Sequence, residues 1–497
     1  MFYHLSKYLK KELNIKKNIF LVSDSLFFNK WEKENKFNFT NNDIFVKEWK
    51  VFDIHNKTYD LDILKSFEKK IGRPGLIDAL LSDRRIIMGH HCTYTQDYNR
   101  RFTDDELLTI LQKSLLEIDL IFKKYKPKIS FCFVCVTLFD YLLFLFSKYY
   151  ETEFINIRPS RIFNFVQLSN NIFDPCEEIK NIFNSPKNIK KESYNFASSF
   201  LNNQLNYSGK YEGIVKPSLV PAEKLNTNRN IFRIFKQFSQ NLTSYYFSES
   251  YKDNHSPNPL LIAIFKYFIL PYRSKRVNKF LSNSYVKPND LSNKEYAFLP
   301  LHTEPEVSLL VYAKPFVNQI EVVRYVALNL PVGMKLVVKE HPWMIGKRKI
   351  NSYKKLLNIP NVLISSPEVT TKEWIDKSKF VSIISSSVGQ EAVLLGKPVL
   401  TFGNCTINIL PDHMVKNAKS LLNLGNDINT LIKNYKSNKK VLIRYLASIK
   451  QSTYPVNLYS SLLARKMAFK YEKSKFNEDI ILLGNHIINK LNYMKRL

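Results

Sequence analysis

The sequence predicts an α/β fold in which parallel strands are covered by helices on both faces. Short apolar runs indicate strands at 335–339, 380–384 and 399–402, and a helix from Val388 to Leu395 separates the second run from the third. Continuous apolar runs that alternate with helices are typical of a parallel sheet buried on both sides. Ligands of such sheets bind at the carboxyl ends of the strands, so the residues after each run are the first candidates for a site.

Polar residues follow two of these predicted strands. His341-Pro342 comes just after the first strand, and the turn Ser385-Ser386-Ser387 comes just after the second. The serine turn precedes a helix, whose unpaired N–H groups and partial positive charge suit a phosphate. Pro342 biases His341 toward an extended backbone, so its imidazole is expected to project into a cleft and donate to a phosphate oxygen.

Three further residues extend this candidate phosphate site. Glu391 lies in the first turn of the helix, where its carboxylate can accept from a ribose diol. Gln390 is expected to orient the ligand, and Lys339 adds a positive charge at the end of the first strand. A structural alternative stays open, because Ser387-x-x-Gln390 also fits a capping box that needs no ligand, and a lone histidine after a strand is usually a loop residue.

The first half of the chain shows the same alternation of strands and helices. Thr103 and Glu106 fit a capping box at the start of a long helix to about residue 124. The other expected elements are a strand at 18–22 ending near Asp24, a strand at 129–136, a helix at 138–150, and a strand at 154–157 that leads to Arg158 and Arg161. This order predicts a second doubly wound domain.

Several short motifs occur in a fixed order between Tyr296 and Gly403. They are Leu301-His302-Thr303-Glu304-Pro305-Glu306, Asn318-Gln319, Leu330-Pro331, Val338-Lys339-Glu340-His341-Pro342, Asn361-Val362, and Gly389-Gln390-Glu391-Ala392 followed by Gly396-Lys397-Pro398-Val399. This set resembles the capsular polysaccharide biosynthesis family, which includes the β-Kdo transferases of bacterial capsules. The resemblance implies a GT-B glycosyltransferase, with two Rossmann-like domains facing a cleft and helices at the C-terminus. It also implies that His341-Pro342 and Gln390-Glu391, with the adjacent Gly389, line the nucleotide-sugar donor site.

The predicted reaction is transfer of a sugar from a nucleotide donor to a glycan or glycolipid hydroxyl, with CMP-Kdo as one candidate donor. The departing phosphate gains negative charge, which His341, Lys339 and the helix amides would stabilise. No cofactor or metal is expected, because this region lacks a DxD-like acidic motif. An inverting enzyme needs a carboxylate base, for which Asp24 and Glu304 are the candidates. A structural role at a strand end is the alternative for Glu304 and for Glu306.

Three other functions remain open at this point. A teichoic-acid-type glycerophosphotransferase would have a similar serine turn but would use a CDP-alcohol. A sugar-nucleotide epimerase would share the fold and act on a soluble substrate. A non-enzymatic protein that binds nucleic acid or membrane is suggested by the net charge of +30 alone.

The length of 497 residues is too great for one core and predicts several domains. We expect an N-terminal domain at 1–280 with a helical insertion near 164–254, a linker at 281–294, a nucleotide-sugar domain at 295–440 and terminal helices at 441–497. Five cysteines indicate a reducing cytosol rather than a disulfide framework. Cys132 and Cys135 are expected in a buried strand, and His90-His91-Cys92 is assigned no metal.

The excess of lysine over arginine argues against a nucleic-acid partner, because arginine is the usual reader of bases and phosphates. Two basic, amphipathic segments, 1–17 and 257–276, suit either a membrane surface or a core-packing helix. The apolar run 129–146 contains Asp140, so no transmembrane helix is predicted. The expected location is cytoplasmic, peripheral at the inner face of the membrane, with capsule-assembly proteins as partners.

Overall fold

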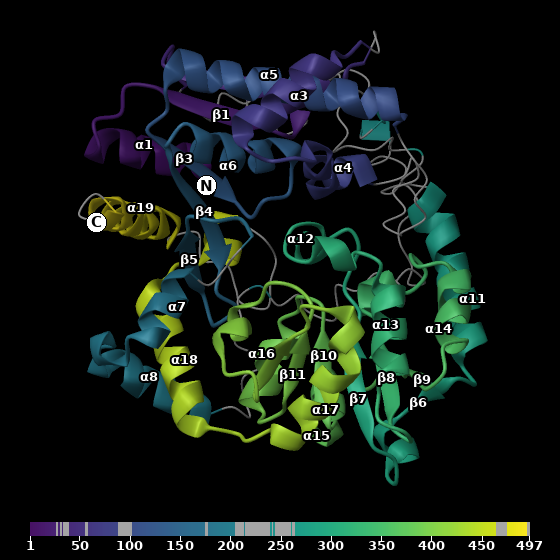
Figure 1. Ribbon diagram of the computed structural model, residues 1–497. Helices are drawn as coiled ribbons and strands as arrows, with labels where there is room; N and C mark the ends of the chain where they lie inside the picture. Colours follow the sequence, from purple (N-terminus) through teal and green to yellow (C-terminus); the bar gives the residue numbers. More distant parts are fainter. Residues whose placement is uncertain are drawn as a thin grey trace.

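The chain forms an N-terminal and a C-terminal α/β domain in a computed structural model (Figure 1). The structure describes residues 1–25, 28–29, 32, 39–54, 58–87, 102–173, 177–203, 213, 239–240, 242–243, 260, 264–463 and 475–494. The predicted α/β class with parallel sheets is confirmed. His90, His91, Cys92 and Cys176 lie outside the described residues, as does most of the second half of the predicted insertion at 164–254.

The C-terminal domain is built on a parallel sheet that has seven strands among the described residues. In sheet order these are β12 (Val415–Asn417), β11 (Val399–Thr401), β10 (Phe380–Ile383), β7 (Tyr296–Pro300), β8 (Lys335–Lys339), β9 (Val362–Ser365) and β6 (Tyr285–Val286). Each described pair of neighbours is parallel. From β7 the chain adds β8 and β9 on one side, and then returns to add β10, β11 and β12 on the other. This reversal is the arrangement of a doubly wound sheet, with its switch point between β7 and β10.

Helices cover both faces of this sheet, as the continuous apolar strands predict. One face packs against α11 (Leu270–Leu281), α13 (Gln319–Leu328), α14 (Ile350–Leu357) and α17 (Leu424–Asn434). The other face packs against α15 (Thr371–Lys377), α16 (Val388–Leu394) and α18 (Lys439–Ser452). Successive strand residues alternate between the two cores, so Val337 joins one cluster and Val338 the other.

The N-terminal domain is less regular than the C-terminal domain. A parallel pair, β1 (Asn18–Val22) and β2 (Asp43–Lys47), stands apart from a mixed sheet of β3 (Ile129–Phe133), β4 (Glu153–Pro159) and β5 (Phe165–Ser169). β3 and β4 are parallel and joined through α6 (Leu138–Tyr149), as predicted, but β5 returns antiparallel. The surrounding helices are α3 (Leu61–Ile71), α4 (Arg84–Ile87) and α5 (Asp104–Tyr125), the last of which begins with the expected Thr103 and Glu106 capping box.

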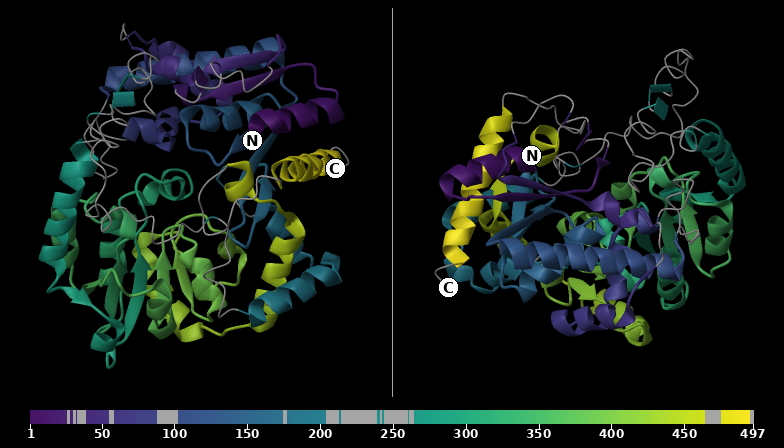
Figure 2. Two further views of the ribbon diagram at one scale, coloured as in Figure 1. Left: turned by 180° about the vertical axis from the view of Figure 1, so that it is seen from behind. Right: turned by 90° about the horizontal axis from the view of Figure 1, so that it is seen from above.

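The C-terminal end of the chain crosses back to the N-terminal domain. β13 (Thr453–Pro455) adds to the mixed sheet beside β5, and α19 (Phe476–Met494) packs next to α1 (Phe2–Glu12), as Figure 2 shows from two sides. Leu5 and Leu9 of α1 are buried in this contact. The first amphipathic segment is therefore a core-packing helix in this fold.

Several predicted boundaries fall inside structural elements. The expected linker at 281–294 contains β6, which pairs with β9 at the edge of the C-terminal sheet. α7 (Glu177–Asn184) and α8 (Lys191–Asn202) share a core cluster with α18.

Cys132 and Cys135 are buried, as predicted, although Cys135 lies after the end of β3. Within the described parts of the chain, no helix combines the length and apolar character needed to cross a bilayer.

Candidate functional site

The candidate site lies at the switch point of the C-terminal sheet, where the loops after β7 and β10 separate. His302 follows β7, and its Nε2 accepts a hydrogen bond from the backbone N–H of Ser385 after β10, at 3.3 Å. Because Nε2 accepts, the proton of a neutral His302 lies on Nδ1, which faces Glu306 Oε2 at 3.1 Å. His302 therefore bridges the two loops that form the edge of the site.

His341 is held in a defined orientation after β8. Its backbone N–H donates to Glu340 Oε1 at 2.8 Å, and its ring Nδ1 accepts from the backbone N–H of Trp343 at 3.2 Å. Burial lowers the pKa of His341, which favours the neutral ring. With Nδ1 acting as an acceptor, a neutral ring carries its proton on Nε2 and can donate to a ligand. Pro342 opens a short 3₁₀ turn, Pro342–Met344, that fixes this geometry.

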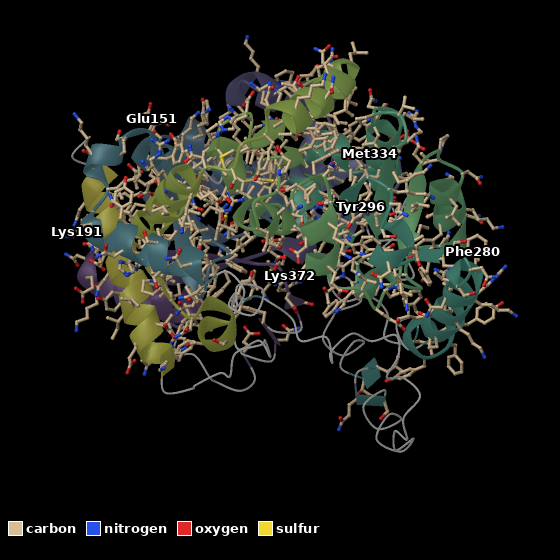
Figure 3. The ribbon with its side chains drawn as sticks, turned by 90° about the horizontal axis from the view of Figure 1, so that it is seen from below. Glu151, Lys191, Phe280, Tyr296, Met334 and Lys372 are labelled. Atoms are coloured by element: carbon tan, nitrogen blue, oxygen red, sulfur yellow. The ribbon has the colours of Figure 1, made fainter. Side chains whose placement is uncertain are left out.

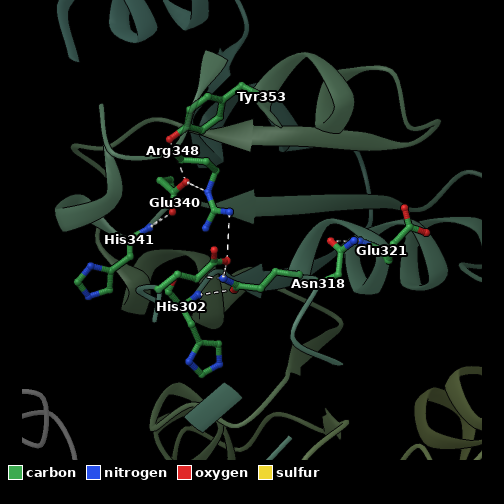
Figure 4. Close-up of polar contacts among 9 residues, drawn as sticks. His302, Asn318, Glu321, Glu340, His341, Arg348 and Tyr353 are labelled. Atoms are coloured by element: carbon green, nitrogen blue, oxygen red, sulfur yellow. Dashed lines mark hydrogen bonds and ion pairs between the residues drawn. The ribbon is translucent and has the colours of Figure 1, made fainter. Parts of the chain in front are cut away.

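A buried network of charges supports both histidine loops (Figure 4). Arg348 donates to Glu340 Oε2 at 2.7 Å and to Glu304 Oε1 at 3.2 Å. Tyr353 donates to Glu340 Oε2 at 2.9 Å, and Gln319 bonds both Glu304 and the backbone of His302. In Figure 4 the rings of His302 and His341 extend away from this network on the same side. The network thus ties the loop after β7 to the loop after β8.

This network corrects the predicted role of Glu304. Glu304 is only 6% exposed and is paired with Arg348 and Gln319. A carboxylate enclosed in this way does not reach an acceptor hydroxyl, so the predicted catalytic base is a structural group. The geometry fits the alternative that the sequence left open for Glu304, which is a structural role at the end of a strand.

Glu306, two residues further on, faces the site instead. Its side chain is 38% exposed and pairs with His302. Burial alone would raise the pKa of Glu306, but the hydrogen bond to His302 and the electrostatic interactions with His302, Arg161 and His341 outweigh it and hold this pKa below its ordinary value. Glu306 is therefore an ionised carboxylate at neutral pH.

The serine turn begins α16, although not through the predicted capping box. Ser387 has helical backbone angles and makes no side-chain cap, because a cap residue of that kind needs an extended backbone. Instead, Ser386 Oγ accepts from the backbone N–H of Val388 at 3.2 Å. Ser385 is fixed by its own hydroxyl, which donates to the carbonyl of Asn404 at 3.0 Å.

The residues of α16 divide between the site and the core. Burial raises the pKa of Glu391 to about 7, while the residue itself remains partly exposed. Gln390 is buried with its Oε1 3.5 Å from the hydroxyl of Tyr445 on α18. A Cβ at Gly389 would overlap Ile383 and lie 2.8 Å from Ile407 Cδ1, so this glycine allows α16 to approach β10. These contacts give Gln390 and Gly389 packing roles, and their predicted ligand roles stay predictions.

Lys339 also points away from the serine turn. Its Nζ donates to the carbonyls of Ser366 and Pro367, at 3.5 and 3.2 Å, in the loop after β9. Burial lowers the pKa of this lysine to about 8. Asp24 follows β1 in the N-terminal domain, on a different sheet, and its assignment as a base stays a prediction.

The N-terminal domain contributes two arginines. The sequence predicted only that they lie at the end of a strand and gave them no role. Arg158 on β4 is 4% exposed and its guanidinium lies 4.3 Å from the ring centre of Tyr312, a residue of the C-terminal half. Among the described residues, its Nη1 has no hydrogen-bond partner. Arg161, with a left-handed backbone at φ 63°, acts electrostatically on both Glu306 and Cys405. The rule that ligands gather at strand ends could have singled out both arginines and His302.

Lys314 joins the two domains near this site. It follows α12 (Val307–Leu310) and donates to the hydroxyl of Tyr141 at 2.9 Å and to Asp78 Oδ2 at 3.1 Å. Leu310 and Val311 are buried in the apolar cluster of the N-terminal domain. The loop that carries His302 and Glu306 therefore leads directly into the contact between the domains.

Comparison with known proteins gives one family match. Residues 232–410 match the family described as capsule polysaccharide biosynthesis protein, which confirms the family resemblance over that part of the chain. Protein FixF of Sinorhizobium fredii is 29% identical over 143 residues, which cover 27% of this chain and only 31% of that protein.

Two solved structures illustrate weaker likenesses. The β-Kdo 2,4 transferase KpsC of Thermosulfurimonas dismutans is 12% identical, with a TM-score of 0.29 over 64% of this chain and 78% of that one. The UDP-GlcNAc 2-epimerase of Neisseria meningitidis, bound to UDP-GlcNAc, is 12% identical, with a TM-score of 0.26 over 96% and 99%. Likenesses at these scores say nothing about activity.

Proposed function

We propose that this protein is a glycosyltransferase of capsule or surface polysaccharide biosynthesis, which transfers a sugar from a nucleotide donor to a glycan or glycolipid hydroxyl. The observation that carries the proposal is the convergence of His302, His341 and the Ser385 turn at the switch point of a doubly wound sheet. Such a crevice is where these sheets bind nucleotides. The family match over residues 232–410 supports the capsule context.

In this proposal the donor phosphates lie between His341 and the start of α16. The Nε2–H of His341 and the positive end of the α16 dipole stabilise the phosphate oxygens, while the backbone N–H of Val388 is already bonded to Ser386 Oγ. They act most strongly as the bond to the sugar breaks, because negative charge then accumulates on the departing phosphate. His341 is fixed before the reaction, because its backbone N–H is bonded to Glu340, which Arg348 holds in place, so little reorganisation is needed at this donor.

Glu391 is proposed to accept from the ribose diol, as predicted. A partly buried carboxylate with a raised pKa gains most when a ligand supplies hydrogen-bond donors to it. Glu306 takes the place of Glu304 as the carboxylate nearest to the reacting groups, since it remains ionised and exposed. Asp24 is the alternative base on the acceptor side.

The buried Arg158 supports an acidic sugar as the transferred group. A guanidinium with an unpartnered Nη1 is costly to bury and is satisfied by a carboxylate, such as that of Kdo. CMP-Kdo therefore remains the first donor to test. The proposed reaction uses no divalent metal, so transfer activity should be unchanged when EDTA is added.

The test is thermal unfolding of the purified protein with CMP, CDP, UDP or GDP. A nucleotide at about 100 times its dissociation constant should stabilise the protein by roughly 2.7 kcal/mol. CMP would indicate an ulosonic acid donor, UDP or GDP a hexose donor, and CDP the glycerophosphotransferase alternative. His341→Ala should abolish the shift.

His413→Ala is the matched control for this experiment. His413 precedes β12 and so lies at the amino edge of the sheet, opposite the strand ends that form the site. It should leave the nucleotide shift unchanged. A folded wild-type protein that no nucleotide stabilises, or an unchanged shift in His341→Ala, would contradict the proposed donor site.

A further inference from the structure

The helical segment from Phe265 to Leu281 has one face buried against the C-terminal sheet. It begins with a π-helical turn, Phe265–Ile269, and continues as α11. The buried positions are Phe265, Leu270, Ser274, Val277 and Leu281. The first two are five residues apart, which the wider π turn allows while both still face inward. Ser274 Oγ also donates to the carbonyl of Ile345 at 3.2 Å, which attaches the helix to the loop before Arg348.

The opposite face of this helical segment exposes large apolar side chains. Ile264 is 39% exposed, Phe268 is 72% exposed and Tyr272 is 65% exposed. They recur every four residues, so they form one stripe along the segment. Single exposed apolar residues are ordinary, but two adjacent exposed aromatic rings on one helix face indicate an interaction surface.

Basic residues continue this stripe in the next turns of α11. Lys275, Arg276 and Lys279 are all exposed. The helix lies at the outer flank of the molecule in the views of Figures 1 and 2. Figure 3 places Phe280, near the end of the same helix, at the flank opposite Lys191 of α8. Among the described residues, the exposed side chains of this helix therefore lie on the outer side of the C-terminal domain.

We propose that the face formed by Ile264, Phe268, Tyr272, Lys275, Arg276 and Lys279 docks the protein on an anionic lipid surface. Apolar and aromatic side chains next to lysine and arginine are the pattern of helices that lie in the headgroup region of a bilayer. The basic residues attract anionic lipid, while Phe268 and Tyr272 insert at the boundary of the acyl chains. The net charge of +30 favours the same partner. The other amphipathic segment, α1, does not compete for this role because its apolar side chains pack into the N-terminal domain, with Leu5 and Leu9 buried and Phe2 and Leu13 partly buried.

Vesicle sedimentation of the full chain tests this docking face. The wild-type protein should bind vesicles containing phosphatidylglycerol and should bind pure phosphatidylcholine vesicles far less. The double variant K275E/R276E should lose about fivefold in partition coefficient for each residue changed. The double variant F268S/Y272S should lose about tenfold or more, because the inserted aromatic area is removed.

Matched controls change the same residue types elsewhere on the surface. V332S/L422S removes two fully exposed apolar side chains, and K436E/K440E reverses two exposed charges on the segment before and at the start of α18. Both controls should bind vesicles like the wild type. Equal losses in the controls, or no wild-type binding to anionic vesicles, would overturn the proposal. So would a wild-type dimer that F268S/Y272S dissociates without any vesicle binding, since the face would then join two copies of the chain.

The docking face and the proposed transferase activity can fail independently. F268S/Y272S should retain the full thermal stabilisation by nucleotide, because none of the changed residues contacts the site. Conversely, His341→Ala should bind vesicles like the wild type. Loss of both properties in F268S/Y272S would indicate misfolding and would count against the docking face, since surface substitutions on an exposed stripe should leave folding intact.

Discussion

Two layers of polar residues at the strand ends of the C-terminal sheet differ in how their charges are satisfied. The supporting layer consists of Glu304, Gln319, Glu340, Arg348 and Tyr353, which bond mainly to one another. The layer that we propose faces the ligand, the ligand-facing layer, consists of His302, Glu306, His341 and Glu391; His302 bonds to Glu306 and to the backbone of Ser385, and His341 Nδ1 accepts from the backbone of Trp343.

The contrast is sharpest between Glu304 and Glu306, which are separated by one residue. Glu304 is enclosed by Arg348 and Gln319, and burial raises its pKa despite these partners. Glu306 pairs with His302, and its pKa is lowered. Residue type alone does not identify a catalytic carboxylate, because the same group is structural or reactive according to the partners that surround it.

Breaking the supporting layer should have the largest effect on stability. Arg348→Met leaves two buried carboxylates without their shared partner, which should lower the free energy of unfolding by about 3–5 kcal/mol. Urea unfolding measures the change. The exposed pair of Arg324 and Glu321 is the control, and Arg324→Met should leave the free energy of unfolding almost unchanged. Similar losses in both variants would remove the distinction between the layers.

Changing the ligand-facing layer should raise stability while it weakens binding. In the wild type, the pKa of Glu391 is about 7 against an ordinary value of 4.5, so the folded state holds this proton more tightly than the unfolded state. Stability is therefore lost as the pH rises from about 4.5 through 7. Glu391→Gln removes this loss, and should be more stable than the wild type by up to about 3 kcal/mol at pH 8 and equal to it near pH 4.5.

The measurement for Glu391→Gln is chemical unfolding at both pH values, with nucleotide affinity measured in parallel. Affinity should fall, since the neutral amide accepts less strongly from a ribose diol. Glu368→Gln, at an exposed glutamate, should change neither property. A pH-independent stability difference in Glu391→Gln would show that this carboxylate is not the titrating group.

The packing of α16 on β10 should be sensitive to a single methyl group. Gly389→Ala places a Cβ against Ile383 and Ile407, which should destabilise the protein by about 1–3 kcal/mol. Ile383→Val removes the atom that the new Cβ overlaps, so the double variant should recover part of the loss. If the free energy of unfolding of the double variant is lower than the two single changes predict by addition, the overlap is not the cause.

The two serines at the start of α16 should give the smallest difference. Ser386→Ala removes the acceptor for the N–H of Val388 and should cost about 1 kcal/mol, as helix caps do. Ser387→Ala should change stability by less than about 0.5 kcal/mol, since its side chain makes no cap. Thermal unfolding of both variants checks this order, and the opposite order would restore the capping box that the sequence predicts.

The sequence by itself determined the parallel sheet and its strand ends, because apolar runs are local properties. It located β8, β10, β11 and α16 to within about a residue. It also narrowed the site to the loops that carry His341 and the serine turn, since ligand positions follow from strand direction.

Only the tertiary structure decided which of those residues face the candidate site. Four residues were candidates by type and position but make other contacts. Lys339 donates to a backbone carbonyl, and Glu304 pairs with Arg348. Gln390 lies next to Tyr445, and Gly389 allows a close helix contact. The pairing of His302 with Ser385 joins residues 83 positions apart. These contacts form only after strands have been added on both sides of β7, and they join residues that are far apart in the chain. A local sequence pattern therefore does not predict them.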